Sequence, residues 1–131
     1  MADFPTKKYG VIYADPPWQF KLRSDKGKDK SPERHYPVLS LTDICRLPVD
    51  TITKDNAVLL MWVCDPMLDQ ALEVINAWGF KYKTVGFTWA KTNRKKLGFF
   101  TGLGYWTRGN PEMCLLATKG RPKRKAMDVA Q

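Results

Sequence analysis

The chain has 131 residues, 44% of them hydrophobic, which is enough for one folded domain with a real core. Its 22 Lys and Arg residues outnumber the 13 Asp and Glu residues, and the net charge of +9 favours a polyanionic partner such as nucleic acid. On charge alone, a basic surface that only keeps the chain soluble is an equally good explanation.

The cysteine and histidine content argues against several classes of site. Three scattered cysteines without a Cys-x-x-Cys pair indicate neither a zinc site nor a disulfide framework, so we expect no metal and read each cysteine as a small core residue. A single histidine disfavours Ser/His/Asp hydrolysis. The longest apolar run, residues 57–64, is too short to span a membrane, and we expect a cytoplasmic protein.

The first predicted element is a buried strand over residues 9–14, which ends at Asp15-Pro16-Pro17-Trp18. Two prolines stop the strand, and open α/β sheets place ligands at the carboxyl ends of their strands. The turn offers a carboxylate, proline carbonyls and a flat ring, which suit a flipped nucleobase that needs acceptors for its amine and a plate to stack on. The tetrapeptide alone fits a plain turn with Trp18 in the core equally well.

A long polar segment, residues 19–34, follows this turn and carries six Lys and Arg residues without periodicity. We predict a loop whose cations contact phosphates, with a solvated surface loop as the alternative. Ser40 and Asp43 then predict the capped start of a short helix that runs to about Arg46 and ends before Pro48.

A strand–helix–strand unit occupies the middle of the chain. Residues 56–64 form a continuous apolar run, which predicts a central parallel strand covered on both faces. Asp65 and Pro66 predict the cap and first residue of an amphipathic helix, Gly79 predicts its end, and residues 80–90 predict the next strand.

The basic stretch of residues 91–97 leaves the end of that strand and should lie at the same sheet edge as Asp15. Residues 100–104 have the FxGxG spacing of a cofactor loop, but no helix can follow them, so we predict a tightly turning substrate-facing loop instead. The turn Asn110-Pro111 precedes a last strand over residues 112–119, and residues 120–131 are predicted to form a flexible basic tail.

These motifs together resemble the MT-A70 family of S-adenosylmethionine-dependent N6-adenine methyltransferases. They occur in the order of that family over nearly the whole chain: Asp15-Pro16-Pro17-Trp18, Tyr36-Pro37 with Ser40, Leu60-Met61-Trp62-Val63, Trp89-Ala90-Lys91-Thr92, and Gly104-Tyr105-Trp106 with Glu112 and Cys114.

The resemblance implies an α/β, Rossmann-like methyltransferase fold of three layers that uses S-adenosyl-L-methionine. It also implies that Asp15, Pro16, Pro17 and Trp18 are catalytic, with Asp15 also at the cofactor. It places Tyr36 near base and cofactor, and it places Lys91, Asn110 and Glu112 at the substrate base. Without the resemblance, Lys91 would be taken for a surface cation and Glu112 for an edge-strand charge. Three further tryptophans are expected in the core: Trp62, Trp89 and Trp106.

The chain departs from the family pattern at its carboxyl end. MT-A70 domains continue with a His/Arg-Lys-Pro segment, a helix and a Glu-Leu-Phe strand that hold much of the cofactor, and nothing after Lys119 resembles them. We therefore expect residues 1–131 to form a single partial domain, incomplete at its C-terminal side. Alone it should bind the cofactor weakly, and a second copy or another chain would complete it.

Three functions are compatible with the sequence. The first is N6-adenine methylation, of DNA in preference to RNA because the chain opens almost directly on the catalytic strand. The second is a non-catalytic nucleic-acid-binding remnant of a methyltransferase. The third is a structural subunit that needs a partner chain.

Overall fold

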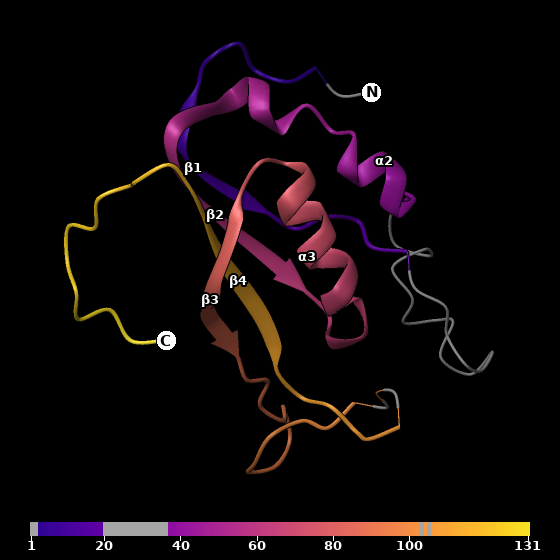
Figure 1. Cartoon of the computed structure of the whole chain (residues 1–131). Coiled ribbons are helices and arrows are strands. Elements are labelled where there is room, and N and C mark those ends of the chain that lie inside the picture. The colour runs from indigo at the N-terminus through magenta and orange to yellow at the C-terminus, as the bar shows by residue number, and fades with distance from the viewer. Residues whose placement is uncertain (1–2, 20–36, 103, 105) are drawn as a thin grey trace.

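The computed structural model describes residues 3–19, 37–102, 104 and 106–131. They form a four-stranded sheet of order β1-β2-β4-β3 with two α-helices packed on it (Figure 1). β1 (Tyr9–Ala14) pairs in parallel with β2 (Thr53–Val63), and β4 (Glu112–Lys119) runs antiparallel between β2 and β3 (Lys81–Trp89). The α/β class is thus confirmed.

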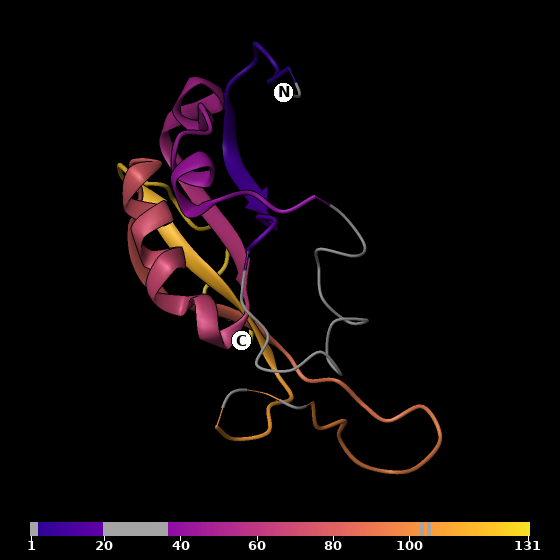
Figure 2. The same cartoon turned by 90° about the vertical axis from the view of Figure 1, so that its right-hand side faces the viewer.

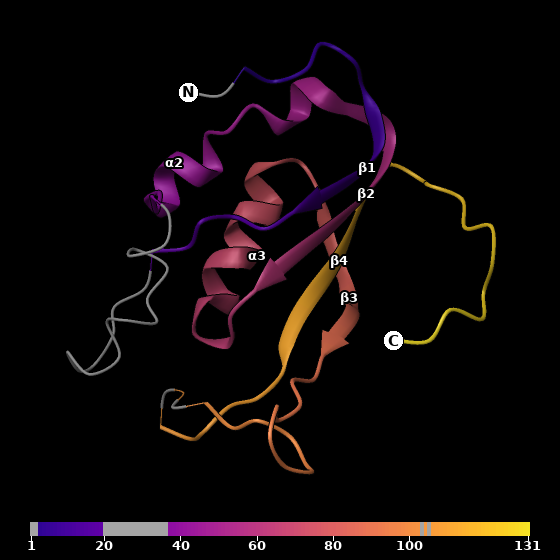
Figure 3. The ribbon, with the colours of Figure 1, turned by 180° about the vertical axis from the view of Figure 1, so that it is seen from behind.

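The position of β4 between β2 and β3 determines which strand ends, and which polar residues after them, lie close together. β2 and β3 run in the same direction, as expected for a strand–helix–strand unit, but they are not neighbours because β4 pairs with both. The carboxyl ends of β1, β2 and β3 and the amino end of β4 therefore lie at the same end of the sheet (Figure 3). We call this row of strand ends the sheet edge.

The helix α2 (Leu41–Cys45) begins as its sequence predicts. The Ser40 hydroxyl accepts a hydrogen bond from the backbone N–H of Asp43 at 3.2 Å, and this satisfies one of the otherwise unpaired donors of the first turn. Val49–Ile52 then form the 3₁₀ helix η2, which leads into β2.

The helix α3 (Leu68–Ala77) starts later than predicted, after the 3₁₀ turn η3 (Asp65–Met67). Cys64 rather than Asp65 is the extended residue before this turn, and no side chain caps it, so the predicted cap was wrong. The end of α3 is as predicted: Gly79 has a φ of 82°, and its N–H and that of Phe80 close the last turn on the carbonyls of Asn76 and Ile75, both at 3.0 Å.

The core lies between the sheet and the helices, which cover one face only (Figure 2). Along β2 the residues facing the helices are buried, whereas those on the other face are half-buried, so the prediction that both faces are covered was wrong. The buried apolar side chains on the helix side include Ile12, Ile44, Leu59, Met61, Val74, Ile75, Phe80, Leu115 and Ala117.

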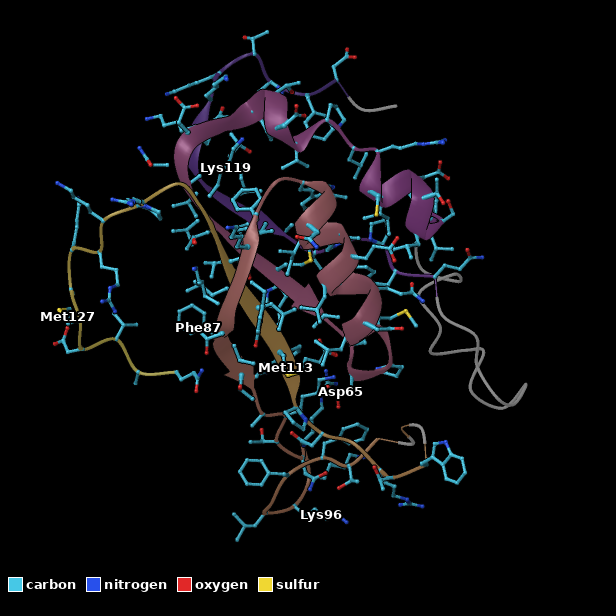
Figure 4. The ribbon with its side chains drawn as sticks, viewed as in Figure 1. Asp65, Phe87, Lys96, Met113, Lys119 and Met127 are labelled. Atoms are coloured by element: carbon cyan, nitrogen blue, oxygen red, sulfur yellow. The ribbon has the colours of Figure 1, made fainter. Side chains whose placement is uncertain are left out.

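The opposite face of the sheet is more open. Val11 and Tyr13 of β1 are 59% and 68% exposed, and no strand in the described part of the chain pairs with the outer edge of β1. Residues 120–131 run without helix or strand beside this face and enclose a hollow of about 600 Å³ against it. In Figure 4 Met127 marks this tail, whose last residue, Gln131, donates a hydrogen bond to the Val85 carbonyl. The flexibility of residues 120–131 stays a prediction.

Trp18 belongs to the core and is only 4% exposed. Its indole N–H donates to the Trp62 carbonyl at 3.1 Å, and its backbone bridges to Leu39. The structure contradicts the prediction that this ring stacks on a base and supports the core alternative, because the end of β2 supplies the partner that a buried indole needs.

We predict that Trp18→Ala lowers the free energy of unfolding by about 3–5 kcal/mol, since it leaves a cavity and removes the bond to Trp62. Chemical denaturation measures the loss. The control is Leu97→Ala at a fully exposed position, which should change stability by no more than about 0.5 kcal/mol. Equal effects of the two substitutions would contradict the core assignment.

Candidate active site

Polar side chains from all four strands meet at the edge described above. Asp15 follows β1 directly, Cys64 and Asp65 follow β2, and Lys91 comes two residues after the end of β3. Glu112 is the first residue of the antiparallel β4. Figure 4 marks this edge by Asp65 and by Met113, the neighbour of Glu112, while Lys119 lies at the far end of β4.

An open hollow of about 710 Å³ occupies this edge. Its volume falls in the usual range for small-molecule sites. The hollow brings together three of the residues predicted to contact substrate, Lys91, Asn110 and Glu112. Its lining consists of Cys64, Asp65, Pro66, Lys91, Thr101, Gly104, Thr107, Arg108, Gly109, Asn110, Pro111 and Glu112.

Lys91 and Glu112 form an ion pair across β3 and β4, with Nζ to Oε1 at 2.6 Å. Each side chain is about one third exposed, at 31% and 33%. The Lys91 ammonium also lies 5.1 Å from the centroid of the Trp89 ring. These contacts fix the position of both charges and leave one Glu112 oxygen without this lysine contact.

Asp15 has an exposed side chain, yet its pKa lies above the ordinary value of 3.8. Partial desolvation is the larger cause, and the negative charge of Glu112 is the second. Since the unfolded chain would hold this proton less tightly, the group lowers stability as pH rises from 3.8 through its folded pKa.

The pKa of the Cys64 thiol is also raised, and the negative charge of Glu112 again contributes. Burial, Glu112, Asp15 and Asp65 raise its pKa to about 11, and only Lys91 opposes them. The thiol is therefore neutral near pH 7 and is no activated nucleophile, in agreement with the sequence prediction. Two carboxylates, Asp65 and Glu112, and two cations, Lys91 and Arg108, line the hollow beside it.

The Pro16 and Pro17 carbonyls tie the turn after β1 to the rest of the chain. Pro16 O accepts from the Trp18 N–H at 2.8 Å, and Pro17 O accepts from the Leu39 N–H at 3.1 Å. The turn is thereby held in place from two sides. A carbonyl oxygen can accept two hydrogen bonds, so Pro16 O keeps capacity for one more.

Asn110 uses its side-chain amide on the backbone of the neighbouring loop. Its Oδ1 accepts from the Lys91 N–H at 3.0 Å, and its Nδ2 donates to the Lys91 carbonyl at 2.8 Å and to the Phe100 carbonyl. The residue predicted to contact substrate thus holds Lys91 in position. Sequence spacing alone does not reveal this role.

The tryptophans predicted to be core residues differ in their burial. Trp62 is half-buried, donates from its indole to the Tyr13 hydroxyl at 2.6 Å and meets the Trp89 ring edge-to-face at 6.5 Å. Trp89 is 54% and Trp106 91% exposed, so the prediction was wrong for these two. Trp89 lies on the less covered face, and Trp106 lies in the loop before β4.

Two predicted features lie outside the described residues, Tyr36 and most of the basic loop of residues 19–34. The basic residues after Lys91 are described and exposed, and Figure 4 shows Lys96 on the loop beyond the sheet edge. Sequence reasoning missed Asp65 and Arg108 as lining residues. Asp65 had a usable signal, since it follows a buried strand directly, as Asp15 does.

Within the described residues, no group of three or more His, Cys, Asp or Glu side chains is placed to hold a metal ion. None of the helices described is long and apolar enough to cross a membrane.

Comparison with known proteins explains this constellation. The MT-A70 family model matches residues 9–131. The chain belongs to the MT-A70 family. A Type II methyltransferase, M.MunI of Mycoplasma sp, is 35% identical and aligns over 97% of this chain and 59% of its own length. The N(6)-adenosine-methyltransferase catalytic subunit METTL3 of Homo sapiens is 29% identical over 88% of this chain and 18% of its own length.

An Arabidopsis thaliana N(6)-adenosine-methyltransferase MT-A70-like protein matches at 28% identity over 88% of this MT-A70 chain. The chain therefore spans about 59% of the bacterial relative and between 15% and 18% of these two eukaryotic ones.

We predict that Glu112→Gln moves the pKa of Asp15 down toward 3.8, because it removes the charge that disfavours ionisation. A carboxyl ¹³C NMR titration measures the pKa. Asp50→Asn removes an exposed carboxylate in η2 and serves as the control, with no expected change in Asp15. An equal shift in both variants would contradict the proximity of Asp15 and Glu112.

Proposed function

We propose that this chain carries the substrate side of an N6-adenine methyltransferase that uses S-adenosyl-L-methionine and acts on DNA, with RNA as the alternative substrate. The observation that carries the proposal is the Lys91–Glu112 ion pair in the wall of the hollow, with Asp15 near enough for the Glu112 charge to act on it, in a member of the MT-A70 family. A Rossmann-like fold of three layers is part of the same proposal.

The adenine amine is a poor nucleophile because its lone pair is delocalised into the ring. A site that accepts hydrogen bonds from both amine hydrogens favours a more tetrahedral nitrogen and stabilises the positive charge that develops on it. Asp15 and the remaining lone pair of the Pro16 carbonyl are the proposed acceptors. A carboxylate is too weak a base to remove an amine proton first, so Asp15 acts as an acceptor and the fixed turn supplies positioning.

Glu112 and Lys91 are proposed to orient the base. The Glu112 carboxylate presents acceptor oxygens to the hollow, and Lys91 holds one of them at 2.6 Å. Asn110 keeps the Lys91 backbone in place through its two bonds to it. Asn110 therefore contributes to substrate binding by positioning Lys91. Tyr36 is also proposed to lie near the base and the cofactor, as the family resemblance implies.

The residues present fit a cationic cofactor. Asp15, Asp65 and Glu112 offer carboxylates at the sheet edge, and their charges add to the desolvation that raises the pKa of the Cys64 thiol, an effect that Lys91 opposes. Asp15 is the proposed contact, together with Tyr36. When bound, S-adenosylmethionine would supply an electrophilic methyl group on a positively charged sulfonium.

The basic loops are proposed to hold the nucleic acid strand. Arg94, Lys95, Lys96 and Arg108 are exposed on the two segments that border the hollow, in a chain of net charge +9. Their charges would neutralise phosphates on either side of the target adenine. Both DNA and RNA present such phosphates, so the assay below includes both.

We also propose that the chain associates with a second copy or another chain, which would complete the fold in the cytoplasm. The outer edge of β1, with which no described strand pairs, and the exposed side chains of Val11 and Tyr13 support this part of the proposal. The human relative is named a catalytic subunit.

We predict that Asp15→Asn lowers the rate of labelled-methyl transfer to adenine-containing DNA at least about 100-fold, because it removes a charged acceptor at the amine. The single-turnover assay runs in parallel on the matching RNA, and N6-methyladenine is identified by mass spectrometry. Thermal stability near neutral pH should not fall, since the substitution removes a charge that Glu112 repels.

Asp50→Asn, remote from the hollow, is the control and should keep the wild-type rate. Oligonucleotide binding without any transfer in the wild type would favour the non-catalytic alternative. Wild-type transfer that survives Asp15→Asn would contradict the role given to Asp15.

A further inference from the structure

A group of basic side chains lies at the end of the sheet opposite the active-site hollow. β1 and β2 begin at this end, and β4 ends there because it runs antiparallel to β2. In Figure 4 Lys119 lies at the other end of the sheet from Asp65 and Met113. Three separate segments of the chain supply the cations of this group, which we call the far basic surface: Lys8, Lys54, Lys119 and Arg121.

The turn after β4 is fixed to the beginning of β2. The Arg121 backbone N–H donates a hydrogen bond to the side-chain oxygen of Asn56 at 2.8 Å. Gly120 has a φ of 65°, and a Cβ there would lie 2.3 Å from the Asp55 carbonyl, so a side chain at this position would clash. Arg121 therefore has a defined place beside the segment that carries Lys54.

The far basic surface has little negative charge to balance it. Lys8, Lys54, Asp55 and Asn56 line one shallow hollow of about 350 Å³, in which Asp55 supplies the carboxylate. In the part of the chain that the structure describes, none of the four cations forms an ion pair. Like charges gathered on one surface repel each other and oppose folding, so stability does not explain them, and a polyanion would relieve the repulsion.

We propose that the far basic surface binds the phosphate backbone of the same nucleic acid whose target adenine lies in the active-site hollow. This inference rests on the proposed function, since it assumes a nucleic acid at that hollow. β4 has eight residues, from Glu112 at the hollow to Lys119 at the far basic surface. Its ends are therefore about 24 Å apart. Each strand of duplex DNA carries one phosphate per about 3.4 Å, so a duplex held at both places extends about seven base pairs from the target adenine.

The chemistry of this surface favours nucleic acid over an anionic membrane. Basic segments that bind membranes are amphipathic and bury apolar side chains beside their cations. The described lining of the hollow between Lys8 and Lys54 is polar throughout. Phosphates of a nucleic acid need only the charges and hydrogen-bond donors that lysine and arginine present.

The test measures binding to a DNA duplex of about 24 base pairs, and to the matching RNA duplex, by fluorescence anisotropy from about 50 to 200 mM salt. Arg121→Ser should weaken binding about 8-fold near 0.1 M salt, and Lys54→Ser/Arg121→Ser about 60-fold. The reason is that each lost phosphate contact makes the log–log salt slope less steep by about 0.9. The melting temperature should not fall, because the backbone bond from Arg121 to Asn56 is kept.

Two further variants separate the surface from net charge. Arg46→Ser removes the same charge as Arg121→Ser from an exposed position at the end of α2, and it should change the affinity by less than about 3-fold. Asn56→Ala keeps every charge but releases Arg121, and it should weaken binding about 2- to 10-fold because an unfastened side chain must be ordered on binding.

The outcomes distinguish this surface from the proposed function. A double variant that binds as tightly as wild type, or is weakened no more than Arg46→Ser, overturns the far basic surface and leaves the proposed function standing. The predicted losses of binding, in a wild type that transfers no methyl group, support the surface and overturn the methyl transfer. Failure of the wild type to bind either duplex, or binding to phosphatidylserine vesicles alone, overturns both.

Discussion

β4 pairs antiparallel with β2 on one side and with β3 on the other, and the position of the Lys91–Glu112 ion pair depends on this pairing. It places the first residue of β4, Glu112, at the edge where β1, β2 and β3 end. Lys91 can reach Glu112 only because β3 lies directly beside β4, with Trp89 paired to Glu112 in the register. The ion pair at 2.6 Å then fixes the loop that carries Lys91, and Asn110 fastens the same loop through its backbone.

The charges of the chain differ between its outer loops and the hollow. Overall the chain is basic, at +9, and exposed lysines and arginines occupy the loops beyond the sheet edge. The hollow itself is lined by two carboxylates, Asp65 and Glu112, and two cations, Lys91 and Arg108. Desolvation is the main cause that raises the pKa of both Asp15 and Cys64, and the Glu112 charge adds to it. Under the proposed function, the outer loops would hold a polyanionic strand and Asp15 would face the adenine amine.

Local sequence chemistry predicted the elements whose ends are marked by turn residues. The bounds of β1 and β4 were correct, since Asp15-Pro16-Pro17 and Asn110-Pro111 interrupt the chain there, and Gly79 marked the end of α3. The beginning of β2 was missed because Thr53 to Asn56 is polar and joins the strand through pairing near Tyr9. The position of β4 between β2 and β3 could not be predicted, because no local pattern specifies which strands become neighbours.

The candidate site was predicted in part. Parallel strand ends placed Asp15 and Lys91 at one edge correctly, and the hollow brings Lys91, Asn110 and Glu112 together. The aromatic residues were not predictable, since hydrophobicity gives the same expectation for Trp18 and Trp106, whose exposed fractions are 4% and 91%. Only the tertiary structure distinguishes them, because Trp18 lies in the core beside the end of β2 and Trp106 lies in the loop before β4.

The most direct test of the account is the pKa of the Asp15 carboxyl, measured by ¹³C NMR without and with saturating S-adenosylmethionine. If Asp15 lies at the binding site of a cationic methyl donor, the bound cation favours the ionised carboxylate and the pKa of Asp15 must fall. An Asp15 pKa that stays where it was, or rises, at saturating S-adenosylmethionine would contradict the account.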